Sequence, residues 1–165
     1  MRERNSVVGF DLGDDISRLR LIMEPDELGG VALVRGDVTD LAQLERALDE
    51  YEVTHVVHLA ALLIPLARAN PVRGAHVNVG GTTNVFEAVK RRIERIRGLA
   101  YASSAAVYDV VDADASGRDE AAVGHPVTLY GVHKLANEGT ARVYWLDHGV
   151  ASVGPAVMPV SRPGP

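Results

Sequence analysis

The sequence predicts an α/β fold in which a doubly wound parallel sheet is covered by helices. Short apolar runs alternate with longer amphipathic runs along the chain, which is the pattern of parallel strands joined by helical crossovers. The composition agrees, because 165 residues of which 47% are hydrophobic can bury one substantial core. We therefore expect a single domain.

Strands are expected where short apolar runs end in polar residues. The run 99–104 is small and apolar and ends in two hydroxyls, which favours a buried strand whose carboxyl end opens into a loop. Similar runs occur along the whole chain. The expected strands are 6–10, 31–35, 54–60, 98–103 and 150–154.

Helices are expected in the amphipathic segments between these strands. Thr39 and Asp40 precede an apolar stripe and make a credible helix start. After Asn78, apolar and small residues fall on one helical face. The segments 12–27 and 109–126 are expected to be loops, the first of them partly helical. The expected helices are 40–50, 71–93 and 128–148.

The composition argues against several classes of function. The net charge is −5 and the pI is near 5.6, whereas a nucleic-acid groove needs a basic surface. The longest apolar run, 56–67, is interrupted by His58 and Pro65 and is shorter than a membrane-spanning helix. The chain contains no cysteine, which excludes disulfides and thiolate catalysis and is consistent with a cytoplasmic protein.

Two groups of charged or ligating residues have ordinary explanations. His55 and His58 are three residues apart on a predicted strand, so they face opposite sides and no metal site is expected. Four arginines lie at the end of the second predicted helix, where cations complement the helix dipole. They are Arg91, Arg92, Arg95 and Arg97.

The leading candidate site residues are Tyr130 and Lys134, one helical turn apart. Positions i and i+4 share a helix face, so the ammonium can lie near the phenol. A free tyrosine, with a pKa of about 10, is a poor base, and a nearby cation favours its ionised form. Upstream, Ser104 and Asn78 add a hydroxyl and an amide to the set.

These residues and the segments around them resemble the extended short-chain dehydrogenase/reductase family, which includes NAD-dependent sugar-nucleotide epimerases and dehydratases. The segments come in the family's order, from about residue 6 to about residue 154. Their joint match is far more specific than any single segment. The matching segments are 7–11, 36–40, 58–61, 78–85, 103–108 and 130–138.

The resemblance implies a Rossmann-like domain and a role for each candidate residue. Tyr130 would take the proton of a substrate hydroxyl while the adjacent carbon gives hydride to the nicotinamide of NAD. Lys134 would lower the pKa of Tyr130 and bind the nicotinamide ribose. Ser104 would hold the substrate oxygen, with Ser103 pairing instead with backbone, and Asn78 would support a relay through water and backbone.

The resemblance also narrows the reaction to a hydroxyl of a nucleotide sugar or related polyol. Dehydrating members usually have Asp-Glu after the serine, whereas this chain has Ala105 and Ala106. Epimerisation or alcohol oxidation is therefore favoured over dehydration. Family members dimerise through the two helices that here contain Asn78 and Lys134, so a homodimer is plausible by resemblance.

Three segments are candidates for binding the adenosine and the nicotinamide of NAD. Asp11 ends an apolar strand, where a carboxylate binds the ribose hydroxyls and would repel the extra phosphate of NADP. Asp37 resembles the family's adenine contact but could equally be a turn residue that helps to cap the next helix. Leu59, Ala60 and Ala61 resemble the segment beneath the cofactor, although a buried strand end would have the same residues.

The chain is expected to be a fragment, with 1–154 a partial NAD-binding domain and 155–165 an irregular proline-rich tail. No glycine-rich turn precedes the strand at 6–10, so the first, central strand of the sheet and its phosphate-binding nest are expected to be absent. The C-terminal substrate lobe of the family is expected to be absent as well. The sheet should then either keep a gap or pair the strands around it directly, and either outcome should displace Asp11 and weaken NAD binding. The rival interpretation is a non-catalytic dinucleotide-binding or scaffold protein on the same fold.

Overall fold

The computed structural model describes residues 6–108 and 124–157 and has seven short strands, all paired in parallel. One sheet pairs β1 with β2, a second has the order β3-β4-β6, and a third pairs β5 with β7. The strands are β1 Val7–Asp11, β2 Val31–Arg35, β3 His55–His58, β4 Gly98–Tyr101, β5 Ser103–Ser104, β6 Ser152–Val153 and β7 Ala156–Val157.

The predicted helices 40–50 and 128–148 are confirmed, and the segment 71–93 is a composite helix with a π-helical turn inside it. The longest helix ends at Gly149, whose φ of 68° is a left-handed conformation that glycine adopts freely. The helical elements are η1 Leu19–Leu21, α1 Pro25–Leu28, α2 Leu41–Glu50, α3 Ile64–Ala69, α4 Pro71–Ala75, η2 His76–Gly80, α5 Gly81–Lys90, η3 Ala105–Val107 and α6 Leu129–His148.

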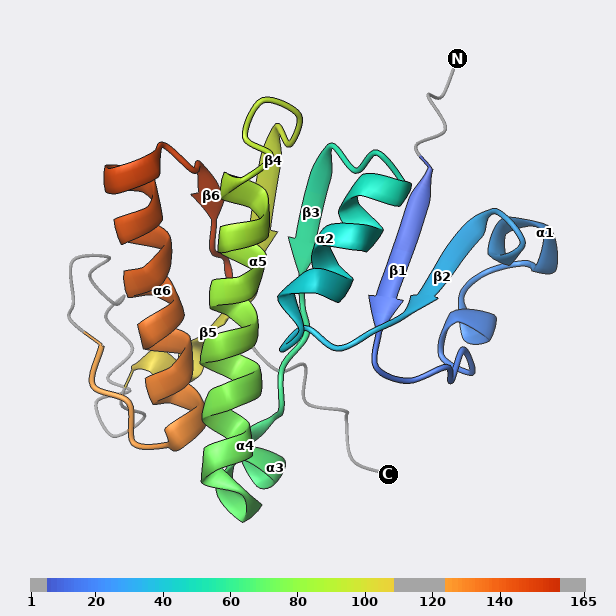
Figure 1. The fold of residues 1–165 in the computed structure, drawn as a ribbon. Coiled ribbons are helices and arrows are strands. Elements are labelled where there is room, and N and C mark those ends of the chain that lie inside the picture. Colours follow the sequence, from blue (N-terminus) through green and yellow to red (C-terminus); the bar gives the residue numbers. More distant parts are fainter. Residues whose placement is uncertain (1–5, 109–123, 158–165) are drawn as a thin grey trace, which may run out of the picture.

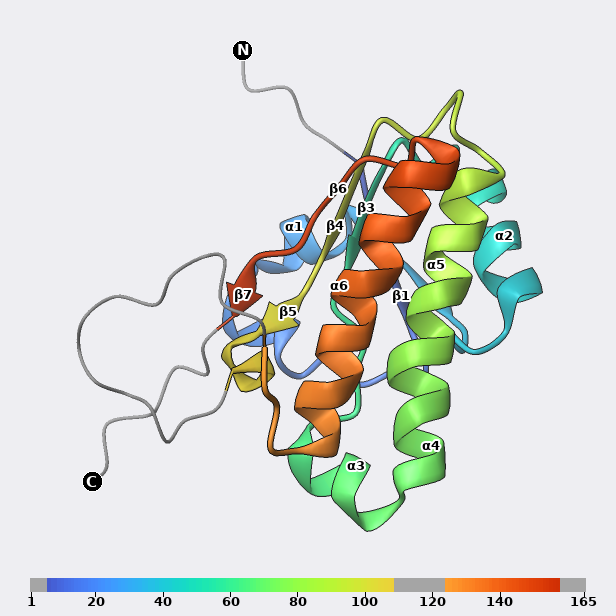
Figure 2. The ribbon, with the colours of Figure 1, turned by 90° about the vertical axis from the view of Figure 1, so that its left-hand side faces the viewer.

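The three long helices α2, α5 and α6 lie on one face of the strands (Figures 1 and 2). On the other face the side chains of Val57 on β3 and Val153 on β6 are 69% and 67% exposed. Both residues are in register with Ala100 of β4, so they share that face. A doubly wound sheet has helices on both faces. In the described part of the chain, the long helices cover only one face.

The core lies between the sheet and the helices α5 and α6. Phe86 of α5 is fully buried, and its ring packs edge-on against Tyr101 and at a tilt against Tyr144, with 5.7 Å and 5.3 Å between centroids. Leu99 and Tyr101 of β4 alternate with partly exposed neighbours, as expected for a strand with one covered face. This cluster holds the strand that leads into the candidate site.

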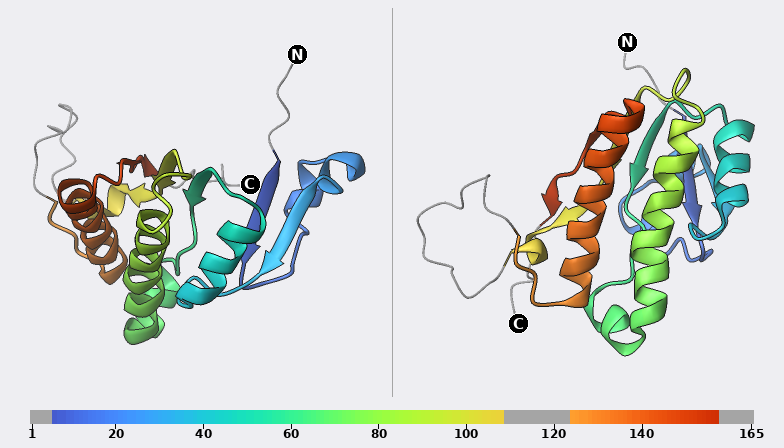
Figure 3. Two further views of the ribbon diagram at one scale, coloured as in Figure 1. Left: turned by 45° about the horizontal axis from the view of Figure 1, so that its top comes forward. Right: turned by 60° about the vertical axis from the view of Figure 1, so that its left-hand side comes forward.

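The sheet keeps a gap at the place of the central strand, which was expected to be absent. Among the described residues β1 pairs only with β2, and β3 pairs on one side only, with β4. Of the two expected outcomes, the gap is confirmed and direct pairing of β1 with β3 is wrong. Figure 3 shows β1 and β2 as a separate ribbon beside the main sheet.

The helix α2 attaches the β1-β2 pair to the main sheet through ion pairs with α5 and the turn after it. Arg92 Nε donates to Asp49 Oδ1 at 2.7 Å, and Arg95 donates to the same oxygen at 2.7 Å. Arg92 also donates to the carbonyl of Ala88 at the end of α5, at 3.1 Å. Arg92 therefore caps the helix, as expected for the cluster, and Arg92 and Arg95 also bind Asp49 of α2.

Several predicted element boundaries differ from the structure, for example at β4 and β6, which are shorter than expected. The strand predicted at 54–60 ends at His58, because the next residues turn away from β4 towards α3. The segment 155–165, predicted to be irregular, begins with the short strand β7, which pairs with β5 at Ser103 and Ser104. The predicted loop 109–126 lies outside the described residues apart from its last three positions and gives no structural result.

Candidate active site at the carboxyl edge of the sheet

The candidate residues gather where β3 and β5 end and α6 begins. Thr128 caps α6 by accepting a hydrogen bond from Gly131 N at 3.0 Å, which places Tyr130 in the first turn. Ser104 caps the next short helix, η3, by accepting from Ala106 N at 3.2 Å. The two caps orient the phenol and the hydroxyl on neighbouring segments.

Gly131 allows these segments to approach each other. A Cβ at this position would lie 2.1 Å from the carbonyl oxygen of Ala106 and 2.8 Å from the Pro126 side chain. Only a residue without a Cβ fits such a contact between helix and loop. The start of α6 can therefore pack directly on the turn that holds Ser104.

The structure brings Ser104, Tyr130 and Lys134 together. The Ser104 hydroxyl is hydrogen-bonded to the Tyr130 phenol. The ammonium of Lys134 donates to the carbonyl of Ala102 at 2.7 Å and lies over the Tyr130 ring, 5.5 Å from its centroid. The hydroxyl, phenol and ammonium expected from the sequence thus form one cluster.

The expected effect of Lys134 on Tyr130 is not observed. Burial raises the pKa of the Tyr130 phenol, and the hydrogen bond from Ser104 offsets only part of that rise. Burial also lowers the pKa of Lys134. Desolvation disfavours both charged forms, so here it outweighs the attraction of an ammonium that lies over the ring, and the phenol stays protonated near neutrality.

Asn78 lies on the π-helical turn and holds the segment after β3. Its Oδ1 accepts from Leu62 N at 2.7 Å and its Nδ2 donates to Leu62 O at 2.9 Å. The same Nδ2 is 3.4 Å from His133 Nδ1 on α6. Among the described residues, Asn78 therefore reaches the Tyr130 helix through His133 and makes no direct bond to Tyr130 or Lys134.

His58 and Thr82 extend this network, and neither was predicted to be a site residue. Thr82 Oγ1 donates to Asn78 O at 2.7 Å and lies 2.9 Å from His58 Nε2. Because the hydroxyl proton is used on Asn78 O, His58 must donate through Nε2. Burial and the charge of Lys134 lower the pKa of His58 to about 4, so its ring is neutral. The spacing i, i+4 from Asn78 was the available signal for Thr82.

Ser103 is separate from the Tyr130 cluster, as expected, but its partners differ from the expectation. Its hydroxyl donates to a carboxylate oxygen of Glu138 on α6. Its N–H donates to Pro155 O at 3.1 Å, next to the pairing of β5 with β7. Ser103 was predicted to pair with backbone. Its N–H does so, but its hydroxyl binds a side chain instead.

The carboxylates proposed for adenosine both bind their own turns. Asp11 Oδ1 accepts from Gly13 N at 2.8 Å, at the exposed end of β1. Asp37 Oδ1 accepts from Thr39 N at 2.9 Å and Thr39 Oγ1 at 2.8 Å, and these hydrogen bonds lower its pKa. Asp37 thus occupies the turn position that was its alternative interpretation.

The segment of Leu59, Ala60 and Ala61 is not a buried strand end. Leu59 is 68% exposed, and both alanines are partly exposed after β3 has ended at His58. Small side chains that remain accessible at the carboxyl edge fit a planar ligand better than a packed core. Ala60 and Ala61 therefore stay partly accessible beyond the end of β3.

The pyrophosphate half of NAD has no matching nest in this chain. Such a nest is a glycine-rich turn opening a helix beside the central strand, and the sequence contains no such turn.

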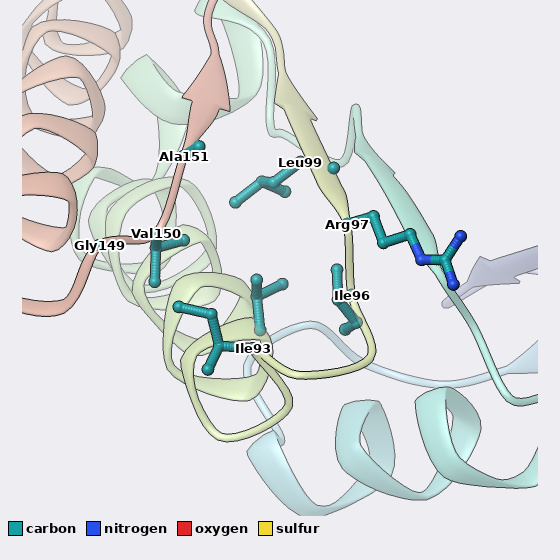
Figure 4. Close-up of a pocket in the computed structure, with 9 residues that line it drawn as sticks. Ile93, Ile96, Arg97, Leu99, Gly149, Val150 and Ala151 are labelled. Atoms are coloured by element: carbon teal, nitrogen blue, oxygen red, sulfur yellow. The ribbon is translucent and has the colours of Figure 1, made fainter.

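An apolar cavity of about 230 Å³ lies away from this site. It is at the amino end of β4, between the end of α5 and the residues that follow α6 (Figure 4). Its lining includes Ile93, Leu99 and Val150, with Arg97 at the side. The cavity contains none of the candidate site residues and forms no part of the site.

Neither a helix that could span a membrane nor a group of possible metal ligands is found among the described residues. No helix in the ranges 6–108 and 124–157 is long and apolar enough to cross a membrane. Over the same ranges, no three histidine, aspartate or glutamate side chains cluster as metal ligands would. His55 and His58 lie on opposite faces of β3, one exposed and the other buried, as their spacing predicted.

A profile described as the NAD dependent epimerase/dehydratase family matches residues 5–160. Among curated proteins, UDP-glucuronate 4-epimerase 2 of Arabidopsis thaliana is 31% identical over 162 residues, which are 93% of this chain and 36% of that protein. The chain therefore spans little more than a third of this relative.

Solved structures share the fold. The UDP-N-acetylglucosamine 4-epimerase from Methanobrevibacter ruminantium, in complex with UDP-N-acetylmuramic acid, is 24% identical with a TM-score of 0.77, over 91% of this chain and 46% of that one. The UDP-glucose 4-epimerase from Thermus thermophilus, in complex with NAD, is 25% identical with a TM-score of 0.72, over 89% and 53%. This chain belongs to the NAD dependent epimerase/dehydratase family.

Proposed function

We propose that this chain provides the proton-transfer half of an NAD-dependent epimerase or oxidoreductase that acts on a hydroxyl of a nucleotide sugar or related polyol. The observation that supports this most strongly is the cluster of Ser104, Tyr130 and Lys134 at the carboxyl edge of the sheet. The relatives and neighbours named above are epimerases of UDP-sugars, which supports the substrate class.

Each residue has a role that follows from its contacts. The Ser104 hydroxyl orients the substrate oxygen, and the Tyr130 phenol moves the proton between that oxygen and the protein. A protonated phenol can return a proton to a ketone oxygen, which is the second half of an epimerisation. Lys134 is fixed by Ala102 O at 2.7 Å and is available to the nicotinamide ribose, and Asn78 holds the segment beside it. When bound, NAD accepts and returns the hydride.

Epimerisation or oxidation is proposed over dehydration. Loss of water needs an additional acid and base near the substrate carbon, and Ala105 and Ala106 follow Ser104 without an ionisable group. For the cofactor we propose NAD, with Asp11 near the adenosine ribose, Asp37 near the adenine, and Ala60 and Ala61 beneath the ring system.

The rival proposal is a non-catalytic dinucleotide-binding or scaffold protein. The cluster of Ser104, Tyr130 and Lys134 favours the enzyme over this rival. A homodimer through α5 and α6 is also proposed, since exposed apolar residues such as Val143 and Leu146 lie on α6.

The test uses an extended protein in which the N-terminal and C-terminal parts of a UDP-glucuronate 4-epimerase are placed ahead of residue 6 and after residue 154. Turnover of UDP-glucuronate with NAD is followed by NMR of the sugar carbon 4. Tyr130→Phe should lower the rate by roughly 10²- to 10⁴-fold, because the phenol carries the proton. NAD binding should change little.

Tyr144→Phe is the matched control, because its phenol only donates to Glu87 at 3.2 Å and its rate should stay near that of the parent. A Tyr130→Phe rate within about tenfold of the parent, or 1.36 kcal/mol of barrier, would remove Tyr130 as the proton carrier. An extended protein that binds NAD without turning over any nucleotide sugar or polyol would support the scaffold alternative.

A further inference from the structure

His133 of α6 is a buried histidine to which the proposed reaction gives no role. It is 6% exposed, in the part of α6 that packs on α4 and on the π-helical turn η2. Figure 2 shows α4 and α3 beside the end at which α6 begins. A Cβ placed on Gly74 of α4 would lie 3.3 Å from His133 Cε1, so the ring packs closely on that helix. The imidazole is therefore enclosed between these elements, one residue before Lys134.

The hydrogen bonds of Asn78 determine which nitrogen of His133 carries the proton. Leu62 N needs an acceptor and Leu62 O needs a donor, and the Asn78 amide supplies both, through Oδ1 at 2.7 Å and Nδ2 at 2.9 Å. This orientation of the amide leaves the second hydrogen of Nδ2 for His133 Nδ1, 3.4 Å away. A neutral imidazole has one acceptor and one donor nitrogen, so Nδ1 accepts and Nε2 carries the proton. Burial lowers the pKa of His133, which favours this neutral ring.

The contact between Asn78 and His133 is long but has no replacement in the described part of the chain. At 3.4 Å it is a weak hydrogen bond. However, Asn78 is 1% exposed, and within residues 6–108 and 124–157 its Nδ2 has no acceptor other than Leu62 O and His133 Nδ1. Loss of the imidazole would leave a buried N–H unsatisfied, which costs more than the bond itself contributes. The amide would avoid that cost by turning away, and it would then release Leu62.

We propose that His133, as the Nε2–H tautomer, is a positioning residue that holds Asn78 on Leu62 and thereby fixes the segment beneath the ring of NAD. That segment, Ala60 and Ala61, directly precedes Leu62 and lies beyond the end of β3. Asn78 therefore holds it at a point outside the strand. This role rests on the proposed function, because it requires that NAD binds at the two alanines.

The test compares His133→Asn with His133→Leu. The Oδ1 of asparagine is as many bonds from the backbone as the Nδ1 of histidine and accepts a hydrogen bond, whereas leucine has a similar branched shape and no acceptor. Asparagine is the poorer helix former of the two, so helix propensity acts against the expected order of the variants.

The first measurement is amide hydrogen exchange in the 165-residue chain. Exchange at Leu62, whose N–H donates to Asn78, is divided by exchange at Phe86, which is fully buried in α5 and reports opening of the core. This ratio should rise about tenfold or more in His133→Leu, because the released amide leaves the Leu62 N–H without its acceptor. It should stay within about threefold of the parent ratio in His133→Asn.

A spectroscopic measurement tests the tautomer separately. In a chain labelled with ¹⁵N at its histidines, NMR of His133 near neutral pH should show a protonated Nε2 and an unprotonated Nδ1. Its signals are assigned by their loss in His133→Asn. A protonated Nδ1, an unchanged exchange ratio in His133→Leu, or the same ratio in both variants would overturn the proposal.

The link to NAD is measured in the extended protein of the previous section. His133→Leu should weaken NAD binding by about tenfold or more, whereas His133→Asn should stay within about threefold of the parent. Equal NAD affinities of the two variants would refute the effect of His133 on the ring-binding segment. The proposed function fails separately, through Tyr130→Phe: a rate near that of the parent would remove Tyr130 as the proton carrier and leave the result for His133 standing.

Discussion

Gly131 shows how one residue determines the geometry of the candidate site. Because Gly131 has no Cβ, which would lie 2.1 Å from Ala106 O, the first turn of α6 can pack on the turn that holds Ser104. The hydrogen bond between Ser104 and Tyr130 depends on that approach. The pKa of Tyr130 depends on it as well, because the same packing buries the phenol.

We predict that Gly131→Ala destabilises the chain and separates Ser104 from Tyr130. The added Cβ would lie 2.1 Å from Ala106 O. Because a backbone atom can move away only at a high energetic cost, we expect the free energy of unfolding to fall by about 1–3 kcal/mol. Gly139→Ala is the control, since a Cβ there meets nothing within 4 Å and should stabilise the helix by about 0.5–1 kcal/mol. Urea unfolding of both variants measures the difference, and an equal effect of the two would contradict the argument.

At the scale of elements, the π-helical turn His76–Gly80 organises the buried polar network. It lies between α4 and α5 and directs the side chain of Asn78 to Leu62 while its carbonyl accepts from Thr82. π-helical turns inside α-helices are rare and frequent at functional sites. Here the turn links the segment after β3, the helix α5 and the helix α6.

We predict that Thr82→Val destabilises the chain more than Thr83→Val does. Thr82 is 1% exposed and satisfies both Asn78 O and His58 Nε2, so its loss leaves buried partners and should cost about 1–3 kcal/mol. Thr83 is only partly buried and donates to Val79 O alone. Comparing the free energies of unfolding tests this, and a larger effect at Thr83 would be the contrary result.

At the scale of the whole molecule, the β1-β2 sheet and the β3-β4-β6 sheet are joined by helix contacts instead of by strand pairing. The helix α2 follows β2 and packs on α5, while Asp49 and Glu45 bind Arg92. Each ion pair at such a surface is worth little alone, but a network has more effect. The relative position of β1 and β3 depends on this helix pair.

We predict that Asp49→Asn removes part of the acid sensitivity of the chain. Hydrogen bonds from Arg92 and Arg95 hold the pKa of Asp49 well below its usual value of 3.8. A carboxyl with a lowered folded-state pKa stabilises the fold above its unfolded pKa, and that stabilisation is lost as the pH falls below about 4. The difference between the urea midpoints at neutral and at acidic pH should be smaller for Asp49→Asn than for the exposed control Asp147→Asn. An equal change in the urea midpoint with pH in the two variants would contradict this prediction.

We predict that the 165-residue chain binds NAD more weakly than about 1 µM. The sequence has no glycine-rich phosphate nest, and β1, which ends at Asp11, is not paired with β3. Calorimetric titration with NAD and NADP measures both affinities. Micromolar binding of NAD would show that the pyrophosphate is held in another way, and tighter binding of NADP would exclude Asp11 as the ribose contact.

How much of the site could be predicted depends on the range of the interactions. Tyr130 and Lys134 are one turn apart on a helix, and Ser104 follows a strand that joins that helix at the same edge, so their meeting follows from local patterns. Asp37 and Ser103 each had more than one possible partner. Sequence spacing alone does not decide which partner each side chain binds. His58 and His133 were missed because each meets its partner only after β3, α5 and α6 have packed.

The sequence by itself determined the order and type of the five longer strand segments and three long helical segments, since periodicity, caps and strand-end hydroxyls act within a few residues, but it did not predict α3, or β5 and β7 as separate strands. It also limited the sheet to two outcomes once no central strand was available. Only the tertiary structure decided between them, because the position of β1 depends on the sum of the α2 contacts with α5 and the shared core. It likewise decided the protonation of Tyr130, since desolvation depends on every atom packed around the phenol and not on Lys134 alone.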